Sequence, residues 1–258
     1  MPSIEFQIKN QIAFITFNRP EKFNSFNREM ALSLQQRLNE INESKTVRCV
    51  YITGAGKAFS AGQDLAEVAD PNGPGLNKIL SEYYNPIIIQ IRNLDMPVVA
   101  AVNGVAAGAG ANIALCCDIV VAAESSSFIQ AFSKIGLIPD SSGTFFLPRL
   151  IGFQKASALM MLGDKVSSTE AERMGMIYKI FADDIFEKES LKIADTLASM
   201  PTKGLAFTKQ ALNNSLSNNL QQQLQIEDEI QQRAGSTSDF KEGVKAFLEK
   251  RLPLFKGE

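Results

Sequence analysis

The 258-residue chain is long enough to bury one sizeable core, and its composition, 45% hydrophobic and 21% charged, is typical of a soluble α/β protein. Its 26 basic and 28 acidic residues leave a net charge of −2, so we expect neither nucleic acid nor a membrane surface as a partner. The chain has no histidine, which excludes Ser-His-Asp and Cys-His nucleophiles and leaves a carboxylate as the favoured acid–base group.

The cysteines and the N-terminus bear on the compartment. Cys49, Cys116 and Cys117 show no metal-ligand or redox spacing, so we interpret them as small buried side chains in a reducing compartment. The N-terminus lacks the pattern of a secretory signal, and no apolar run is long enough to span a membrane. A cytoplasmic location is therefore expected.

The first fifty residues predict a hairpin, a helix and a strand. Residues 4–9 and 12–17 alternate apolar and polar side chains around Asn10-Gln11, which is typical of a β-hairpin. Residues 27–41 carry apolar side chains at helical spacing, with Asn27 as the expected cap. Residues 50–53 predict a short buried strand.

Two glycine turns follow core strands. Residues 57–65 contain Gly62 and lead into an expected helix start. Residues 95–122 contain a strand at 98–102 that we expect to be buried on both faces, then Gly104, Gly108 and Gly110, a buried helix at 111–117 and a strand at 119–122. These three glycines are expected to allow positive φ and close approach to a ligand.

The two turns have two possible interpretations. Each turn can simply allow a helix and a strand to pack closely. Alternatively, two turns that follow neighbouring strands can place two backbone N–H groups at one point, which is what an oxyanion hole requires. The motifs of adenine nucleotide and dinucleotide sites are incomplete in both turns, so neither ATP nor NAD is expected.

The middle of the chain contains one notable carboxylate. Residues 70–75 form a cluster of turn residues, expected to be mobile, and residues 80–94 predict a helix. Asp140 follows Leu137-Ile138-Pro139 and precedes a Ser-Ser-Gly turn. Asp140 is therefore either the N-cap of the next helix or a residue that performs chemistry.

The last third is predicted to be largely helical, at residues 154–162, 167–174 (capped by Ser168 or Thr169), 185–199, 206–232 and 240–252. In residues 206–232, leucines recur every four residues. Such stripes are either intrachain core or a subunit interface. We therefore divide the chain into a layered core, residues 1–200, and a C-terminal helical oligomerisation region, residues 201–258.

Several motifs, in this order, resemble those of the crotonase, or enoyl-CoA hydratase/isomerase, family over essentially the whole chain. They are Asn18-Arg19-Pro20 with Asn24-Ser25-Phe26, the segment 57–65, the segment 101–110, Cys117-Asp118-Ile119, and Gly136-Leu137-Ile138-Pro139 with Gly143-Thr144. Within the family, residues 61–65, 107–111 and 132–141 most resemble the ring-epoxide isomerases of phenylacetate breakdown.

This resemblance implies an α/β fold, a crotonase-type ββα spiral with C-terminal helices used for trimerisation, as a homotrimer or hexamer. It implies an acyl-CoA thioester substrate and no metal or cofactor beyond the coenzyme A of that substrate. The thioester carbonyl would lie between the backbone N–H groups of Gln63 and Ala109, which match the family's oxyanion hole.

The resemblance also bears on the reaction. The two glutamates of the family's hydratases align with Asn112 and Phe132, so simple hydration is disfavoured. Asp140 lies where some family isomerases carry their carboxylate and would shuttle a proton or guide rearrangement of a ring epoxide to an oxepin. Phe132, Ile138 and Phe145 would desolvate Asp140 and raise its pKa. Asn112 would be either a polar orienter or an inert buried amide.

Other residues are expected, from the resemblance, to contact the substrate. The CoA arm would follow Lys22, Phe23 and the turn at 61–66, with Lys57, Lys250 or Arg251 near its phosphates. The full set of predicted substrate-binding residues is Lys22, Phe23, Ala61, Gly62, Asp64, Leu65, Ala66, Gly108, Asn112, Phe132 and Ile138, beside the catalytic set Asp140, Gln63 and Ala109.

Other functions are weighed beside the ring-epoxide isomerase. The chain could be a Δ3,Δ2-enoyl-CoA isomerase or a hydratase with unusual residues. An aryl-CoA dehalogenase would use an aspartate nucleophile, but the expected aromatic clamp is not evident in a chain without tryptophan. The chain could also be a non-catalytic acyl-CoA-binding module used for assembly.

Overall fold

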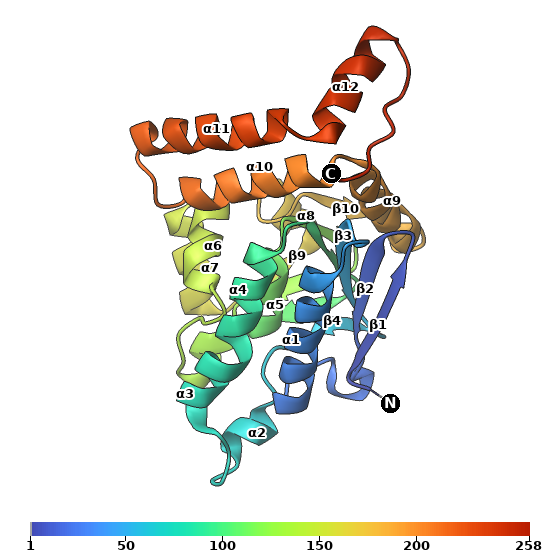
Figure 1. Ribbon diagram of the computed structural model, residues 1–258. Helices are drawn as coiled ribbons and strands as arrows, with labels where there is room; N and C mark the ends of the chain where they lie inside the picture. The colour runs from blue at the N-terminus through green and yellow to red at the C-terminus, as the bar shows by residue number, and fades with distance from the viewer. Residues whose placement is uncertain (1) are drawn as a thin grey trace.

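A computed structural model describes residues 2–258, which form two β-sheets covered by helices (Figure 1). The larger sheet has the order β1-β2-β3-β5-β7-β10, with β1 antiparallel to β2 and the other neighbours parallel. Its strands are β1 (Ile4–Lys9), β2 (Ile12–Phe17), β3 (Cys49–Gly54), β5 (Val98–Val102), β7 (Ile119–Ala123) and β10 (Lys179–Phe181). The expected burial of β5 on both faces is confirmed.

The smaller sheet has the order β4-β6-β8-β9, and β9 is its antiparallel member. Its strands are β4 (Ala58–Ser60), β6 (Val105–Ala107), β8 (Ser127–Ile129) and β9 (Lys165–Ser167). Three times in succession the chain leaves a strand of the larger sheet and enters a strand of the smaller one, as β3-β4, β5-β6 and β7-β8. This repetition is the expected α/β spiral of the crotonase type.

Helices fill the connections and the C-terminal third. They are η1 (Pro20–Lys22), α1 (Arg28–Glu43), α2 (Leu65–Ala69), α3 (Gly75–Lys78), η2 (Ile79–Tyr84), α4 (Asn85–Asn93), α5 (Ala109–Leu115), η3 (Ala131–Ile135), α6 (Gly143–Ile151), α7 (Phe153–Leu162), α8 (Ser168–Arg173), α9 (Phe186–Ser199), α10 (Thr202–Ser215), α11 (Leu220–Gly235) and α12 (Ser238–Leu248). Of these, η2 is a π-helical segment that continues directly into α4. None of the helices within residues 2–258 is long and apolar enough to cross a membrane.

The N-terminal predictions are confirmed for physical reasons visible in the backbone. Asn10 and Gln11 both adopt positive φ, as the tight hairpin between β1 and β2 requires. The Asn27 side chain accepts a hydrogen bond from the Met30 amide and caps α1. The apolar face of α1 is fully buried at Met30, Leu34, Leu38 and Ile41.

Two glycines differ from expectation. Gly108 has φ +52°, but Gly104 and Gly110 have no positive φ. A Cβ at Gly104 would lie 2.2 Å from the Lys57 carbonyl oxygen, and one at Gly110 would lie 2.6 Å from the Ser60 backbone and side chain. These two positions are therefore glycine because neighbouring backbone leaves no room, and the expectation of positive φ there is wrong.

Two helix boundaries also differ from expectation. The predicted helix at 206–232 is two helices, α10 and α11, because Asn219 forms a capping box with Gln222 and starts a new helix. The cap of α8 is Ser167, which accepts from the Glu170 amide, and not Ser168 or Thr169. The leucine spacing continues from α10 into α11, so periodicity did not show the break between them.

The C-terminal helices form one end of the molecule (Figure 1), where α10 and α11 lie side by side. Lys209 of α10 is buried and pairs with Asp118 at 2.9 Å, which ties this helix to the larger sheet. Much of α12 is exposed. The division of the chain at residue 200, and assembly through these helices, stay predictions.

Candidate active site

The turn after β4 contacts the turn after β6. Gly62 has φ +86°, and a Cβ there would lie 2.7 Å from the Ala107 carbonyl oxygen and 3.1 Å from the Ala109 amide nitrogen. A side chain at this position is therefore excluded both by backbone conformation and by space. The contact brings Gln63, the next residue, beside the start of α5.

Each turn presents a free backbone amide. Gly108, with φ +52° and ψ −128°, precedes Ala109, the first residue of α5, whose N–H has no acceptor within the helix. The hydrogen bonds within residues 2–258 give no acceptor to the N–H of Gln63 or to that of Ala109. Two unpaired donors on adjoining turns, one of them at a helix N-terminus, are suited to stabilise a developing oxyanion.

Asn112 links the second turn to Asp140. Asn112 lies one helical turn after Ala109, is 1% exposed, and donates from Nδ2 to the Asp140 carbonyl oxygen at 2.8 Å. Its Oδ1 accepts from Gln130 Nε2, also at 2.8 Å. Of the two open interpretations of Asn112, these contacts favour the polar orienter, because its amide holds the loop that carries Asp140.

Asp140 is not a helix cap. The N-cap position of α6 is Ser142 in the left-handed conformation, with no side-chain cap, so the interpretation of Asp140 as an N-cap is wrong. The Ser141 hydroxyl donates to Asp140 Oδ1 at 2.8 Å. Burial raises the pKa of Asp140 above its ordinary value, and the Ser141 hydrogen bond opposes this shift. A partly desolvated carboxylate of this kind is a better base than an exposed one.

The apolar residues expected around Asp140 differ in how deeply they are buried. Phe132 is buried, and its ring lies 3.8 Å from where a Cβ at Gly108 would stand, so it covers the second glycine turn. Ile138 is 80% exposed and Phe145 is 40% exposed. The predicted direction of the pKa shift agrees with the structure, but Ile138 does not bury the carboxylate within this chain.

Tyr84 is a residue of this region that sequence reasoning missed. Its side chain is fully buried, and its hydroxyl donates to Gln63 Oε1 at 2.6 Å. Burial raises its pKa well above the ordinary value, and the negative charges of Asp140, Glu67 and Asp64 raise it further. Tyr84 ends a π-helical segment, which leaves no signal in helical periodicity.

The other predicted substrate-binding residues cluster near the first turn. The Asp64 carboxylate caps α2 and pairs with Arg19 at 3.0 Å. Asn24, of the motif Asn24-Ser25-Phe26, has a structural role, because its Nδ2 donates to the carbonyl oxygens of Ala55 and Ala58. The exposed members of this group are Lys22, Phe23, Ala61, Leu65 and Ala66. Contact of these residues with a ligand stays a prediction.

The basic residues expected near phosphates are dispersed. Lys57 is exposed at the start of β4. Residues 250–251 follow α12, at the end of the molecule opposite α2 (Figure 1), and Arg251 pairs with Glu242 at 2.6 Å and with Glu249 at 2.7 Å. Residues 250–251 therefore lie far from the 61–66 turn within one chain, and their expected place near the CoA phosphates stays a prediction.

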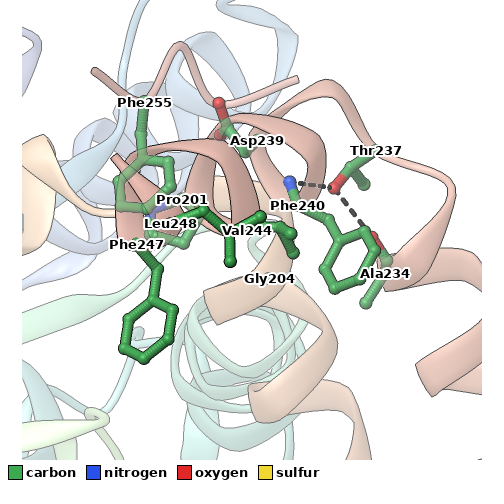
Figure 2. A pocket seen from close by; sticks show the side chains of 11 residues that line it. Pro201, Gly204, Ala234, Thr237, Asp239, Phe240, Val244, Phe247, Leu248 and Phe255 are labelled. Atoms are coloured by element: carbon green, nitrogen blue, oxygen red, sulfur yellow. Dashed lines mark hydrogen bonds between the residues drawn. The ribbon is translucent and has the colours of Figure 1, made fainter. Parts of the chain in front are cut away.

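An apolar hollow of about 460 Å³ lies elsewhere, between the start of α10 and α12 (Figure 2). Phe240, Val244 and Phe247 line it, together with Phe255 of the C-terminal tail. Asp239, its one carboxylate, accepts from the Lys256 and Gly257 amides at 2.7 Å. With this carboxylate committed to the tail, the hollow offers no acid–base group, and the glycine turns with Asp140 stay the candidate site.

The chain is similar to known proteins over its whole length. Residues 7–258 match the family model described as Enoyl-CoA hydratase/isomerase. The chain is 44% identical over 254 residues to the 1,2-epoxyphenylacetyl-CoA isomerase of Escherichia coli (strain K12), covering 97% of each chain. It is 42% identical over 255 residues to a Rhodobacter capsulatus protein named "Probable enoyl-CoA hydratase", covering 99% of this chain and 98% of the relative. The crystal structure of an enoyl-CoA hydratase from Bacillus anthracis superposes with a TM-score of 0.92 at 34% identity, covering 99% of this chain and 100% of that chain.

Proposed function

The chain belongs to the enoyl-CoA hydratase/isomerase family, and from this premise we propose that it is an acyl-CoA isomerase with Asp140 as its proton shuttle. The observation that supports the proposal is that direct contacts connect the turn of Gln63, the turn of Ala109 and the loop of Asp140. The turn of Gln63 touches the turn of Ala109, and Asn112 of the same helix holds the backbone of Asp140.

The proposed reaction begins with the thioester carbonyl between the N–H groups of Gln63 and Ala109. Asp140 removes a proton α or γ to the carbonyl, and the electron pair moves onto the carbonyl oxygen as an enolate or dienolate. The protonated Asp140 then returns the proton to a different carbon. Each preorganised donor stabilises the transition state by roughly 2.7–4 kcal/mol.

One working carboxylate favours isomerisation over hydration. Addition of water requires one group to activate the water and another to handle the α-proton. At the two positions that match the glutamates of family hydratases this chain has Asn112 and Phe132. Both polar atoms of the Asn112 amide are already hydrogen-bonded within the protein, and the Phe132 ring has no acid–base group.

The substrate that we favour is 1,2-epoxyphenylacetyl-CoA, because the Escherichia coli relative named for this substrate is 44% identical over nearly the whole chain. Rearrangement of the ring epoxide to an oxepin also leaves the mass unchanged, and Asp140 would guide it as a proton shuttle or by its charge. Hydration is the second candidate, since the similar Rhodobacter capsulatus protein carries a hydratase name.

The proposal extends to assembly and location. We infer a homotrimer or hexamer that forms through the C-terminal helices, which expose large apolar side chains: Leu212, Leu220, Leu224, Phe240, Val244, Phe247 and Leu248. The proposal uses no metal, and coenzyme A enters only as part of the substrate. Cys49, Cys116 and Cys117 are buried free thiols, which fits a cytoplasmic location.

The test is the mass and ultraviolet absorbance of the products formed from a 3-enoyl-CoA, a 2-enoyl-CoA and the aromatic epoxide. We expect a product of unchanged mass from the 3-enoyl-CoA, the epoxide or both, and no product from Asp140→Ala. A product heavier by one water from the 2-enoyl-CoA would establish hydration instead. Binding of all three thioesters without turnover would support a non-catalytic module.

A further inference from the structure

The side chain of Gln63 is held at both of its polar ends. Tyr84 donates to Gln63 Oε1 at 2.6 Å, and Gln63 Nε2 donates to Glu67 Oε2 at 3.0 Å. Glu67 in turn accepts from the Arg28 amide at the start of α1. The Gln63 side chain is therefore hydrogen-bonded to residues of η2 and α2, and Glu67 extends this connection to α1.

Tyr84, which donates to Gln63, is the last residue of a π-helical segment. A π-turn adds one residue to a helix and rotates the side chains that follow it, at a cost in hydrogen-bond geometry. Here the segment buries two consecutive tyrosines, Tyr83 and Tyr84, to 1% and 0% exposure. Their hydroxyls differ sharply, since that of Tyr83 has no hydrogen-bond partner within residues 2–258.

The Tyr84 hydroxyl is a fixed donor. Burial and the surrounding negative charges hold its pKa well above the ordinary value, so the phenol is a donor at neutral pH. The charges that act on it include those of Asp140 and Glu67. The hydroxyl can therefore keep its bond to Gln63 Oε1 at neutral pH.

We propose that Tyr84 is a positioning residue, which acts through the Gln63 side chain to direct the Gln63 N–H at the substrate carbonyl. This inference rests on the proposed function. The peptide group that carries this N–H is anchored by the backbone, because its Gly62 carbonyl accepts from the Phe26 amide at 2.7 Å, and the Asp64 amide donates to the Phe26 carbonyl at 2.8 Å. The Tyr84 hydroxyl adds a third anchor, through the Gln63 side chain.

The consequence is a specific kinetic pattern. Oxyanion donors act only when they are aimed at the developing charge, and loss of one donor typically costs 10²–10³ in kcat. A donor that is present but poorly aimed should cost a part of this, about tenfold in kcat, with KM within about twofold. Tyr84→Phe tests this pattern, and Tyr83→Phe is the matched control, because it removes the neighbouring hydroxyl that has no partner.

The decisive readout is the carbonyl stretching frequency of bound phenylacetyl-CoA labelled with ¹³C at the thioester carbon. In the wild type, hydrogen bonds from the two amides should lower this frequency relative to the free thioester. Tyr84→Phe should recover much of the difference, and Tyr83→Phe should leave it unchanged. No lowering in the wild type would contradict the oxyanion hole and the proposed function. A lowering that Tyr84→Phe retains would overturn only the positioning role.

A second variant separates positioning from damage to the fold. Gln63→Met removes the side-chain acceptor but keeps the backbone N–H. If Tyr84 acts through Gln63, the double variant should show the same carbonyl frequency and kcat as Gln63→Met alone, because the two changes break one connection. Additive effects would show that Tyr84 acts by another route and would refute the inference.

Discussion

Asn112 has both polar atoms of its amide committed. It donates to the Asp140 carbonyl and accepts from Gln130, and a Cβ on Gly143 would lie 2.4 Å from its Nδ2. Position 143 must therefore be glycine to leave room for the Asn112 amide. Asn112 holds Asp140 by its main chain and leaves the carboxylate free to act.

We predict that Asn112→Ala will damage both stability and catalysis. It leaves Gln130 Nε2 without its acceptor, which should cost about 1–3 kcal/mol of unfolding free energy, and it removes one of the two donors to the Asp140 carbonyl, which keeps its bond from the Gly143 amide at 2.8 Å. Denaturant unfolding and kcat measure the two effects. A variant with wild-type stability and kcat would show that Asn112 is an inert amide.

The raised pKa of Asp140 gives a pH dependence whose sign follows from its direction. As a base, Asp140 works only when ionised, so kcat/KM should fall as pH falls through its raised pKa. The folded state holds this proton more tightly than the unfolded chain does. Its contribution to stability is therefore largest at low pH and is lost as pH rises from the ordinary value, 3.8, through the raised pKa.

Asp140→Asn tests this sign. At neutral pH the variant should be at least as stable as the wild type, since an unfavourable buried charge is removed. A wild-type kcat/KM that does not fall at low pH would contradict the role of Asp140 as the base. A clear loss of stability in Asp140→Asn above pH 6 would contradict its raised pKa.

At the scale of elements, a buried charge cluster fixes the C-terminal region. Asp118, just before β7, pairs with Arg92 of α4 at 2.8 Å and with Lys209 of α10 at 2.9 Å. Burial lowers the pKa of Lys209, and the charge of Asp118 raises it in opposition. The cluster thus joins a sheet strand to two helices distant in sequence.

We predict that Asp118→Ala will lower the unfolding free energy by about 3–5 kcal/mol, because it leaves the buried Lys209 ammonium without its counter-ion. Urea unfolding measures the change. The control is Glu170→Ala, which breaks the exposed pair with Arg173 at 2.7 Å and should have no resolvable effect. Equal effects of the two substitutions would contradict the structural role of the cluster.

Helices, strands and turns could be predicted from the sequence where neighbouring residues alone determine them. Asn27 as a cap, Asn10-Gln11 as a turn and the apolar run of β5 all required only neighbouring residues. The π-segment was not predictable, since tertiary packing of Tyr83 and Tyr84 supports it. The break before Asn219 had a signal, Gln222 three residues on, that the continuous leucine spacing masked.

At the scale of the whole molecule, the strand order and the joining of Gln63 to Ala109 required more than periodicity. Spacing indicated two glycine turns, and the family resemblance implied that they meet. Contact between them depends on β4 and β6 being neighbours in the smaller sheet, which is a long-range pairing. Tyr84 reaches the same point from η2, and no local pattern links it to Gln63.

We predict that the protein assembles through its C-terminal helices. Phe247 of α12 is 82% exposed, so Phe247→Glu should shift the light-scattering mass from three or six chains towards one. Ile8→Glu, on the half-exposed edge strand β1, is the control and should leave the mass unchanged. A monomeric wild type, or loss of assembly with the control alone, would contradict this surface.

We propose that Asp140 moves the proton while other groups bind the thioester. The decisive experiment compares kcat of Asp140→Asn and of the wild type on the substrate that the wild type isomerises, beside the Kd of both proteins for phenylacetyl-CoA. We expect a kcat lower by about 10²–10⁴-fold with an unchanged Kd. A variant that keeps the wild-type kcat, with the same product, would contradict it.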